Sequence, residues 1–259
     1  MYECLLYEIN NGIATITLNR PEIFNAFNTK LTFELQDALK QVTKDAQVRV
    51  VVLTGAGKAF CSGQDLNEAA ELGNRSLSES LHNRYNPIIR GMRNLPKPII
   101  CALNGVAAGA GCSLVLACDV IIASAEASLT EAFINIGLVL DSGSSFFLPR
   151  QVGSLKAFEL STLGSKIKAE EALQLGLVNQ VVAPENLAET VTTLAARYAQ
   201  APTKAIGLIK KMINKSFSAT LDQMLDYEAY CQEIAGRSDD FREGVLAFRE
   251  KRKPVFKGQ

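Results

Sequence analysis

Residues 99–118 constrain the fold most, because these twenty positions carry no charged side chain. An apolar run of about twenty residues has the length that crosses a bilayer. Here the turn residues Asn104 and Gly105 interrupt the run, and Gly109 and Gly111 follow. Such breaks predict a buried strand, a tight turn and a helix in place of a membrane span. We therefore expect the centre of the chain to lie inside a folded core.

The flanking segments alternate strands with helices. Residues 5–9 and 13–18 surround an Asn/Gly turn, which predicts a hairpin. Asn28 can cap a helix over residues 29–46, where leucines repeat at helical spacing. Further elements are a helix at 81–95 and apolar strands at 49–54, 99–103 and 120–123. This order predicts an α/β core with at least partly parallel strands, and the first of these apolar strands is typical of one buried on both faces.

The sequence becomes mainly helical from about residue 155. One expected face carries Leu187, Val191, Leu194 and Tyr198. We divide the chain into a core, residues 1–190, and a helical C-terminal region, residues 191–259. Periodicity leaves open whether this region caps a site, mediates assembly or completes the core.

The composition excludes several classes of function. Of the 259 residues, 27 are Lys or Arg and 27 are Asp or Glu, so no net charge favours nucleic acid or a membrane surface. His82 is the single histidine and there is no tryptophan, so we expect no metal site. Carboxylates become the first candidates for acid–base chemistry. Six cysteines without C-x-x-C spacing, and no visible signal peptide, predict reduced thiols in a cytoplasmic protein.

Two partial motifs for phosphate binding and hydrolysis are weak. Residues 55–58 contain two glycines and a lysine but lack the other positions of a phosphate loop. Ser113 follows Gly111 as in a nucleophile elbow, but Val115 stands where the second glycine is required. His82, the only base available to Ser113, lies in a polar stretch typical of an exposed helix face.

Two glycine-containing turns, residues 59–66 and 104–112, follow apolar strands. Small residues allow the backbone to approach a ligand closely. If the second turn opens a helix, its free N–H groups can bind an oxyanion. Turns of this kind are common, so the turns by themselves favour a purely structural role.

The chain resembles the crotonase superfamily, the enoyl-CoA hydratases and isomerases. The matching segments span most of the sequence: residues 18–21, 25–26, 60–66, 97–119, 170–178 and 248–252. The resemblance implies a spiral of ββα units over residues 1–190, with a helical C-terminal region that caps the site and mediates oligomerisation. It also implies an acyl-CoA substrate, assembly as a homotrimer or hexamer, and no cofactor beyond the CoA that the substrate carries.

The resemblance also assigns roles to individual residues. The backbone N–H groups of Gln64 and Ala110 would hold the thioester oxygen while negative charge grows on it. Two glutamates of the hydratases align with Ser113 and Phe133, so neither carboxylate is present to activate water. Asp141 precedes an expected helix, where aspartate often acts as a cap. Isomerases of the superfamily that act on ring-epoxide phenylacetyl-CoA carry an aspartate at this position.

The same comparison predicts the binding site for CoA and the acyl chain. The implied contacts are Phe24, Ala26, Ser62, Asp65, Leu66, Phe133, Phe248 and Lys251. Arg20, Arg252 and Lys253 are further candidates to bind the anionic CoA, although a solvated basic tail explains the last two equally well.

We expect an acyl-CoA isomerase in which Asp141 shifts a proton through an enolate. The reaction would convert 3-enoyl-CoA to 2-enoyl-CoA, or a ring-epoxide phenylacetyl-CoA to an oxepin-CoA. Three alternatives remain: an enoyl-CoA hydratase, an aromatic-acyl-CoA dehalogenase, for which the histidine–tryptophan pair is incomplete, and a non-catalytic acyl-CoA-binding protein.

Overall fold

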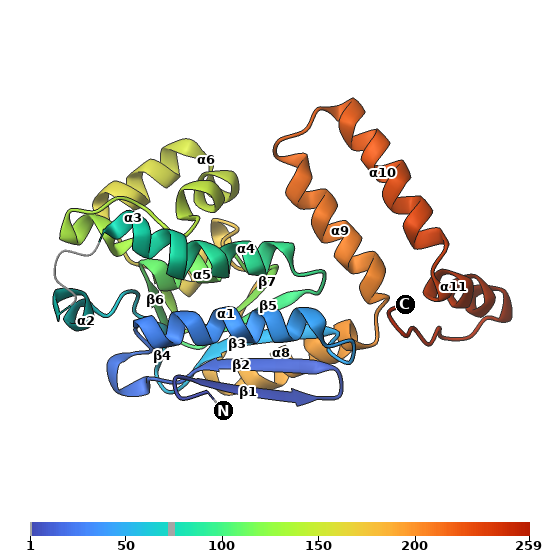
Figure 1. Cartoon of the computed structure of the whole chain (residues 1–259), viewed down its shortest axis with the longest axis horizontal. Helices are drawn as coiled ribbons and strands as arrows, with labels where there is room; N and C mark the ends of the chain where they lie inside the picture. Colours follow the sequence, from blue (N-terminus) through green and yellow to red (C-terminus); the bar gives the residue numbers. More distant parts are fainter. Residues whose placement is uncertain (1, 72–75) are drawn as a thin grey trace.

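The computed structural model describes residues 2–71 and 76–259, whose strands form two sheets (Figure 1). The larger sheet has six strands in the order β1-β2-β3-β5-β7-β10, and the smaller has four in the order β4-β6-β8-β9. The larger sheet contains β1 (Leu5–Asn10), β2 (Ile13–Leu18), β3 (Val50–Gly55), β5 (Ile99–Leu103), β7 (Val120–Ser124) and β10 (Gln180–Val182). The smaller sheet contains β4 (Ala59–Cys61), β6 (Val106–Ala108), β8 (Ser128–Thr130) and β9 (Ile167–Lys168).

Three consecutive strand pairs place their first strand in the large sheet and their second in the small one. These pairs are β3 with β4, β5 with β6, and β7 with β8. Helices follow each pair. After β3 and β4 come α2 (Leu66–Glu71), α3 (Leu77–Ser80), the π-helical segment η2 (Leu81–Tyr85) and α4 (Asn86–Asn94). After β5 and β6 comes α5 (Ala110–Leu116), and after β7 and β8 come the 3₁₀ helix η3 (Ala132–Ile136) and α6 (Ser144–Leu163). The predicted spiral of ββα units is therefore confirmed.

Local signals in the sequence explain the first elements. β1 and β2 pair antiparallel across the Asn/Gly turn, as predicted. Asn28 caps α1 (Thr29–Lys44), since its side chain accepts a hydrogen bond of 2.7 Å from the N–H of Leu31. The second sheet was not predicted. Its strands are two or three residues long, too short to carry a period, and β4 and β6 lie within the two segments that the sequence assigned to turns.

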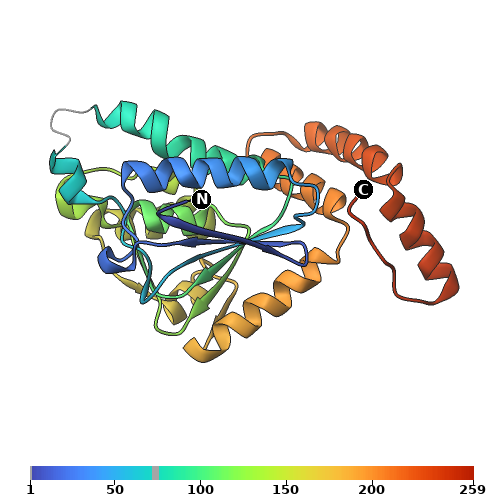
Figure 2. The same cartoon turned by 60° about the horizontal axis from the view of Figure 1, so that its bottom comes forward.

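The large sheet is covered on both faces, with α1 on one side and α8 (Leu187–Ala199) on the other (Figure 2). In β3, Val51 and Leu53 join the main core, whereas Val50 and Val52 pack with α8. The continuous apolar run of this strand is thereby explained. The predicted boundary at residue 190 falls inside α8, a helix that belongs to the sheet.

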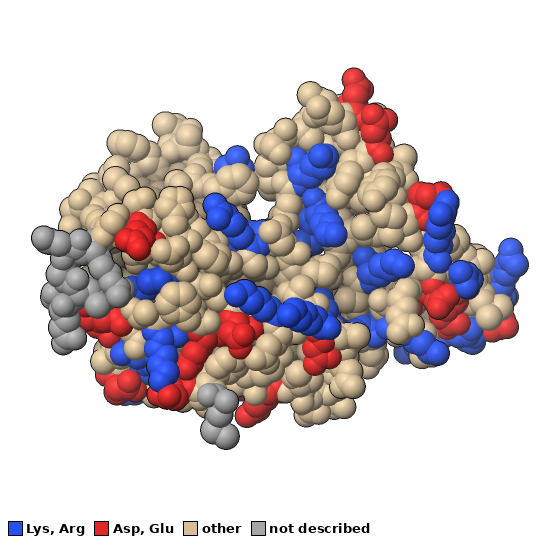
Figure 3. Space-filling model, in the orientation of Figure 1, with Lys and Arg blue, Asp and Glu red and all other residues tan. Residues whose placement is uncertain are grey.

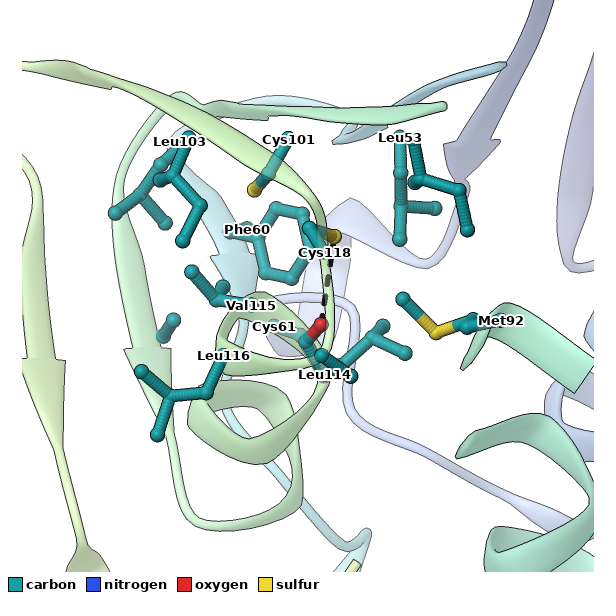
Figure 4. Close-up of a cluster of buried hydrophobic side chains, with 14 of the residues drawn as sticks. Leu53, Phe60, Cys61, Met92, Cys101, Leu103, Leu114, Val115, Leu116 and Cys118 are labelled. Atoms are coloured by element: carbon teal, nitrogen blue, oxygen red, sulfur yellow. Dashed lines mark hydrogen bonds between the residues drawn. The ribbon is translucent and has the colours of Figure 1, made fainter. Parts of the chain in front are cut away.

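Phe60 of β4 lies at the centre of the core between the two sheets and α5 (Figure 4). Its ring is fully buried, which contributes about 1.5–3 kcal/mol to folding. Cys101 and Cys118 lie in the same cluster, and all six cysteines of the chain are buried and free. Burial raises the pKa of the Cys61 thiol to about 12, so this sulfur stays protonated and packs as an apolar group.

The C-terminal helices α9 (Thr203–Ser216), α10 (Leu221–Gly236) and α11 (Asp239–Glu250) extend away from the two sheets (Figure 1). Lys and Arg side chains gather where α9 meets the core (Figure 3). There the buried ammonium group of Lys210 lies 2.6 Å from Asp119, which also pairs with Arg93 at 3.0 Å. Within the described residues, no helix is both long enough and apolar enough to cross a membrane.

Replacing Asp119 with Asn should loosen α9 from the core. Lys210 would keep a buried charge without its partner, and the loss of one member of a buried pair costs about 3–5 kcal/mol. Glu233→Ala, which removes an exposed ion pair with Arg237 on α10, should cost below about 1 kcal/mol. Urea unfolding of the two variants at one protein concentration measures the difference. Equal small losses would contradict the anchoring role of Asp119.

Candidate active site

Two turns approach each other so closely that only glycine fits at their contact. A Cβ atom on Gly111 would lie 2.3 Å from the carbonyl oxygen of Cys61. A Cβ atom on Gly63 would lie 2.8 Å from the carbonyl oxygen of Ala108, and Gly63 also has a φ of +95°. Both distances are far below van der Waals contact. The glycines therefore bring the 59–66 turn alongside the 104–112 turn, which holds Ala110.

At this contact, two backbone N–H groups have no acceptor among the residues that the structure describes. Phe27 and Gln64 form a parallel bridge that uses the carbonyl of Gly63 and the N–H of Asp65. The N–H of Gln64 therefore faces the other way. Ala110 is the first residue of α5, after Gly109 with φ +51°, and first-turn N–H groups have no acceptor within a helix. Among the described residues, neither N–H donates a hydrogen bond.

The loop before α1 lies against the 59–66 turn. The N–H of Ser62 donates to the carbonyl of Phe24 at 3.0 Å. Arg20 donates to the carbonyl of Ala26 at 2.6 Å and pairs with Asp65 at 3.1 Å. Phe24, Ala26, Ser62 and Asp65 are thus brought together beside Gln64. Leu66 starts α2 next to them and is 54% exposed.

Arg20 is a structural ion-pair partner here. Its side chain is 16% exposed and is engaged by Asp65 and the Ala26 carbonyl. The expectation that it offers a free cation to CoA is therefore not supported by its contacts. Arg252 is likewise held by Glu243 and Glu250, whereas Lys253 lies exposed in the tail that follows α11.

Asp141 occupies a strained turn between η3 and α6. The next two residues, Ser142 and Gly143, have φ values of +50° and +89°. Ser142 is held in the left-handed region of backbone conformation, which residues other than glycine rarely adopt. The Ser142 hydroxyl donates to the Asp141 carboxylate at 2.7 Å. Burial raises the pKa of Asp141 above its ordinary value, and the hydrogen bond from Ser142 opposes that rise.

Helix capping does not explain Asp141. Gly143 is the N-cap of α6, and no side chain caps this helix. The carboxylate of Asp141 is instead half-buried beside the site. Its charge contributes to a raised pKa at the Tyr85 phenol, which places the two groups within electrostatic reach. Tyr85 in turn donates a hydrogen bond to the side chain of Gln64.

Ser113 and Phe133 provide no carboxylate at the two positions where hydratases carry one. Ser113 is buried on α5, and its hydroxyl is bonded within the protein. The Phe133 ring lies 3.9 Å from where a Cβ of Gly109 would be, so it packs directly beside the N-terminus of α5. This part of the site is apolar, and apolar surroundings disfavour water and charge.

The sequence prediction missed two residues near the site, Tyr85 and Glu131. Glu131 is fully buried, and burial raises the pKa of its carboxyl to about 7. Its position within the otherwise mostly apolar segment 127–137 was a visible signal of a buried carboxylate. Tyr85 follows His82 by three positions in the sequence, and the burial of Tyr85 depends on how η2 packs against the core. His82 is exposed, as expected.

Phe248 and Lys251 are not part of the site in one chain. Phe248 lies on α11 and is 85% exposed, and Lys251 forms the C-cap of the same helix. Figure 1 shows α11 at one end of the molecule and α2, which follows the 59–66 turn, at the other. The chain thus separates these two residues from Gln64, Ala110 and Asp141.

Comparison with known proteins places this geometry in a family. The pattern of the family "Enoyl-CoA hydratase/isomerase" matches residues 8–259. The 1,2-epoxyphenylacetyl-CoA isomerase of Escherichia coli (strain K12) is 45% identical, and the match covers 100% of both chains. A probable enoyl-CoA hydratase of Rhodobacter capsulatus is 43% identical over 100% of this chain and 99% of its own. The crystal structure of an enoyl-CoA hydratase from Bacillus anthracis superposes with a TM-score of 0.93 at 35% identity, covering 99% of this chain and 100% of that one.

The chain therefore belongs to the enoyl-CoA hydratase/isomerase family and is an enzyme with the crotonase fold. The resemblance inferred from the sequence motifs is confirmed. The relatives carry both isomerase and hydratase names, so the family alone leaves the reaction open.

Gly111→Ala should separate the two turns. The new methyl group would meet the Cys61 carbonyl, and overpacking of this kind costs about 1–3 kcal/mol. A displacement of about 1 Å at the reacting groups can lower the rate by about 10²-fold. Gly236→Ala is the matched control, since nothing lies within 4 Å of its Cβ position at the end of α10. Thermal unfolding and turnover of acyl-CoA should both change in the first variant alone; unchanged turnover in Gly111→Ala would contradict the role of this contact.

Proposed function

We propose that the protein is an acyl-CoA isomerase in which Asp141 moves a proton along the acyl chain. The observation that carries this proposal is the half-buried Asp141 carboxylate, in a turn bonded to α5, together with two backbone N–H groups that donate to none of the described residues. Those donors belong to Gln64 and Ala110. Side chains without carboxylates, Ser113 and Phe133, stand where two glutamates would be needed to activate water.

The reaction starts when the Asp141 carboxylate removes a proton from C2 of a 3-enoyl-CoA. The electron pair of the broken C–H bond delocalises into a dienolate, and negative charge develops on the thioester oxygen. The N–H groups of Gln64 and Ala110 hold that oxygen, and each such donor can contribute about 10²–10³ in rate. The Asp141 carboxylic acid then returns the proton to C4, which yields 2-enoyl-CoA and the free carboxylate.

The Asp141 carboxylate takes up one proton and releases it again in each cycle, so the proposed reaction needs no cofactor besides the CoA of the substrate. A carboxylate in apolar surroundings is a stronger base than one in water, because burial disfavours its charged form. The Phe133 ring contributes to these surroundings beside Gly109. The same ring would limit the access of water to the dienolate.

A ring-epoxide phenylacetyl-CoA is the second substrate that we propose, converted to an oxepin-CoA. The support is the 45% identical Escherichia coli relative, whose name states 1,2-epoxyphenylacetyl-CoA isomerase activity. The N–H groups of Gln64 and Ala110 would stabilise an enolate formed next to the epoxidised ring as well as one formed in an alkyl chain.

We further propose that the active enzyme is a homotrimer or hexamer. Phe248 and Lys251 lie on a helix that projects away from the site of their own chain (Figure 1). Exposed apolar side chains continue along the C-terminal helices at Ile209, Ile213, Phe217, Leu221, Leu225 and Phe241. In an assembly, α11 of a neighbouring copy could bring these two residues to the CoA.

Asp141→Asn should abolish isomerisation, because the amide cannot accept the proton. A general base contributes about 10²–10⁴ in rate, and we expect a loss of that size. The substrates are 3-enoyl-CoA, 2-enoyl-CoA and the ring-epoxide CoA, with product measured by chromatography. Asp226→Asn, an exposed aspartate on α10, is the control and should keep full activity.

The pH dependence follows from the raised pKa of Asp141. The carboxylate must be ionised to act as a base, so activity is present above this raised pKa and is lost as the pH falls through it. Rapid hydration of 2-enoyl-CoA without isomerisation of 3-enoyl-CoA would contradict the isomerase proposal and favour a hydratase. Binding of CoA thioesters without turnover of any of the three would contradict both.

A further inference from the structure

Glu131 is a second carboxyl group close to Asp141, fully buried between β8 and η3. One of its oxygens, Oε1, accepts hydrogen bonds from the Ser144 hydroxyl at 2.9 Å and from the Cys112 thiol at 3.5 Å. The other oxygen, Oε2, is buried and has no partner among the described residues. A charged oxygen without a hydrogen bond is costly in a protein interior, whereas the carbonyl oxygen of a neutral acid costs much less. Burial and the unpartnered Oε2 therefore favour the neutral form of Glu131, while the two hydrogen bonds to Oε1 oppose it.

A chain of hydroxyl groups connects Glu131 to the backbone of Asp141. The Oγ atoms of Ser144 and Ser113 lie 2.8 Å apart. The Ser113 hydroxyl also lies 3.1 Å from the carbonyl oxygen of Asp141. The same carbonyl accepts the N–H of Ser144 at 3.0 Å. The turn that holds Asp141 is therefore bonded to Glu131 through two serines.

A count of the hydroxyl hydrogens shows that the hydrogen bonds from Glu131 through the two serines to Asp141 can run in either of two directions. Each serine hydroxyl carries one hydrogen. When Glu131 is ionised, Ser144 must donate to it and Ser113 must donate to Ser144, so no hydroxyl hydrogen remains for the Asp141 carbonyl. When Glu131 is neutral, its own proton can go to Ser144. Ser144 then donates to Ser113, and the Ser113 hydroxyl is free to donate to the Asp141 carbonyl at 3.1 Å, which is nearer than its other acceptor, the Gly109 carbonyl at 3.3 Å.

We propose that neutral Glu131 is a positioning residue for Asp141, and that its ionisation reverses the hydroxyl chain and releases the Asp141 turn. The turn needs such support, since Ser142 and Gly143 both have positive φ values. Strained backbone of this kind persists only where surrounding contacts hold it. This inference rests on the proposed role of Asp141 as the base.

The groups around Glu131 and Asp141 differ in whether they ionise near neutral pH. Burial raises the pKa of Glu131 to about 7, the hydrogen bonds from Ser144 at the start of α6 and Cys112 on α5 oppose this rise, and the charge of Asp141 adds to it. Tyr85, on η2, is the group facing Asp141. The pKa of Cys112 and that of Tyr85 are both raised, so neither group ionises near neutrality. Glu131 is then the group expected to titrate there.

The inference predicts a bell-shaped pH profile of kcat/KM. Activity rises with the ionisation of Asp141 and falls as Glu131 ionises, with apparent values that belong to the coupled pair. We expect a fall of at least about tenfold between pH 6 and pH 9 in the unaltered enzyme. In Glu131→Gln the amide N–H donates to Ser144 at every pH, so the alkaline limb should disappear while the acid limb stays.

His82→Gln is the control, because it removes the single histidine of the chain, the side-chain type whose unperturbed pKa lies between pH 5 and 8. It is exposed, and its variant should keep the alkaline limb. Ser144→Ala removes one of the two hydroxyl groups between Glu131 and Asp141, and it should remove the alkaline limb of the pH profile or move it to higher pH. An unaltered enzyme without an alkaline limb, or a limb unchanged in both Glu131→Gln and Ser144→Ala, would overturn the proposal.

A stability measurement tests Glu131 without any turnover. The pKa of a free glutamate is near 4.5 and that of folded Glu131 is about 7, so folding takes up a proton between these values. The stabilisation is fully present below the first value and is lost as the pH rises through the second. Melting temperatures should therefore fall over this range relative to Glu131→Gln. A constant difference would overturn the inference, whereas inactivity toward all three CoA substrates with this shift intact would overturn only the proposed function.

Discussion

The close approach of two backbone turns is the contact on which the rest of the site depends. Gly111 lies against the Cys61 carbonyl and Gly63 against the Ala108 carbonyl, at distances that exclude any side chain. Each turn contains a strand of the small sheet, β4 in one and β6 in the other, and both sheets enclose the core around Phe60. Packing of the core therefore sets the separation of the two N–H groups.

A site built from backbone donors assigns different tasks to backbone and side chain. In the mechanism that we propose, negative charge is stabilised by fixed N–H groups, which need no reorganisation as the charge develops. Proton movement is assigned to Asp141, whose raised pKa has its origin in burial. Ser113 and Ser144 hold the turn that carries Asp141, so in this proposal Glu131 controls the position of the base without meeting the substrate.

Periodicity and capping signals were sufficient to predict the hairpin, the helix that begins at Thr29 and the strand Ile99–Leu103. They could not predict the short strands of the second sheet, whose pairing depends on contacts distant in sequence. Asp141, Gln64 and Ala110 were proposed from the resemblance, because backbone donors such as the last two leave no chemical signature in a sequence. Glu131 was missed since its proposed role follows from burial. Phe248 and Lys251 lie on a helix at the other end of the molecule, so their place beside the CoA stays a prediction that depends on a neighbouring copy.

The position of a thioester oxygen tests the central claim most directly. A crystal structure with an unreactive acyl-CoA analogue should show that oxygen about 2.7–3.1 Å from the backbone nitrogens of both Gln64 and Ala110. The Asp141 carboxylate should face the acyl carbons that exchange the proton. An oxygen bound by other groups, or an acyl chain out of reach of Asp141, would contradict the account.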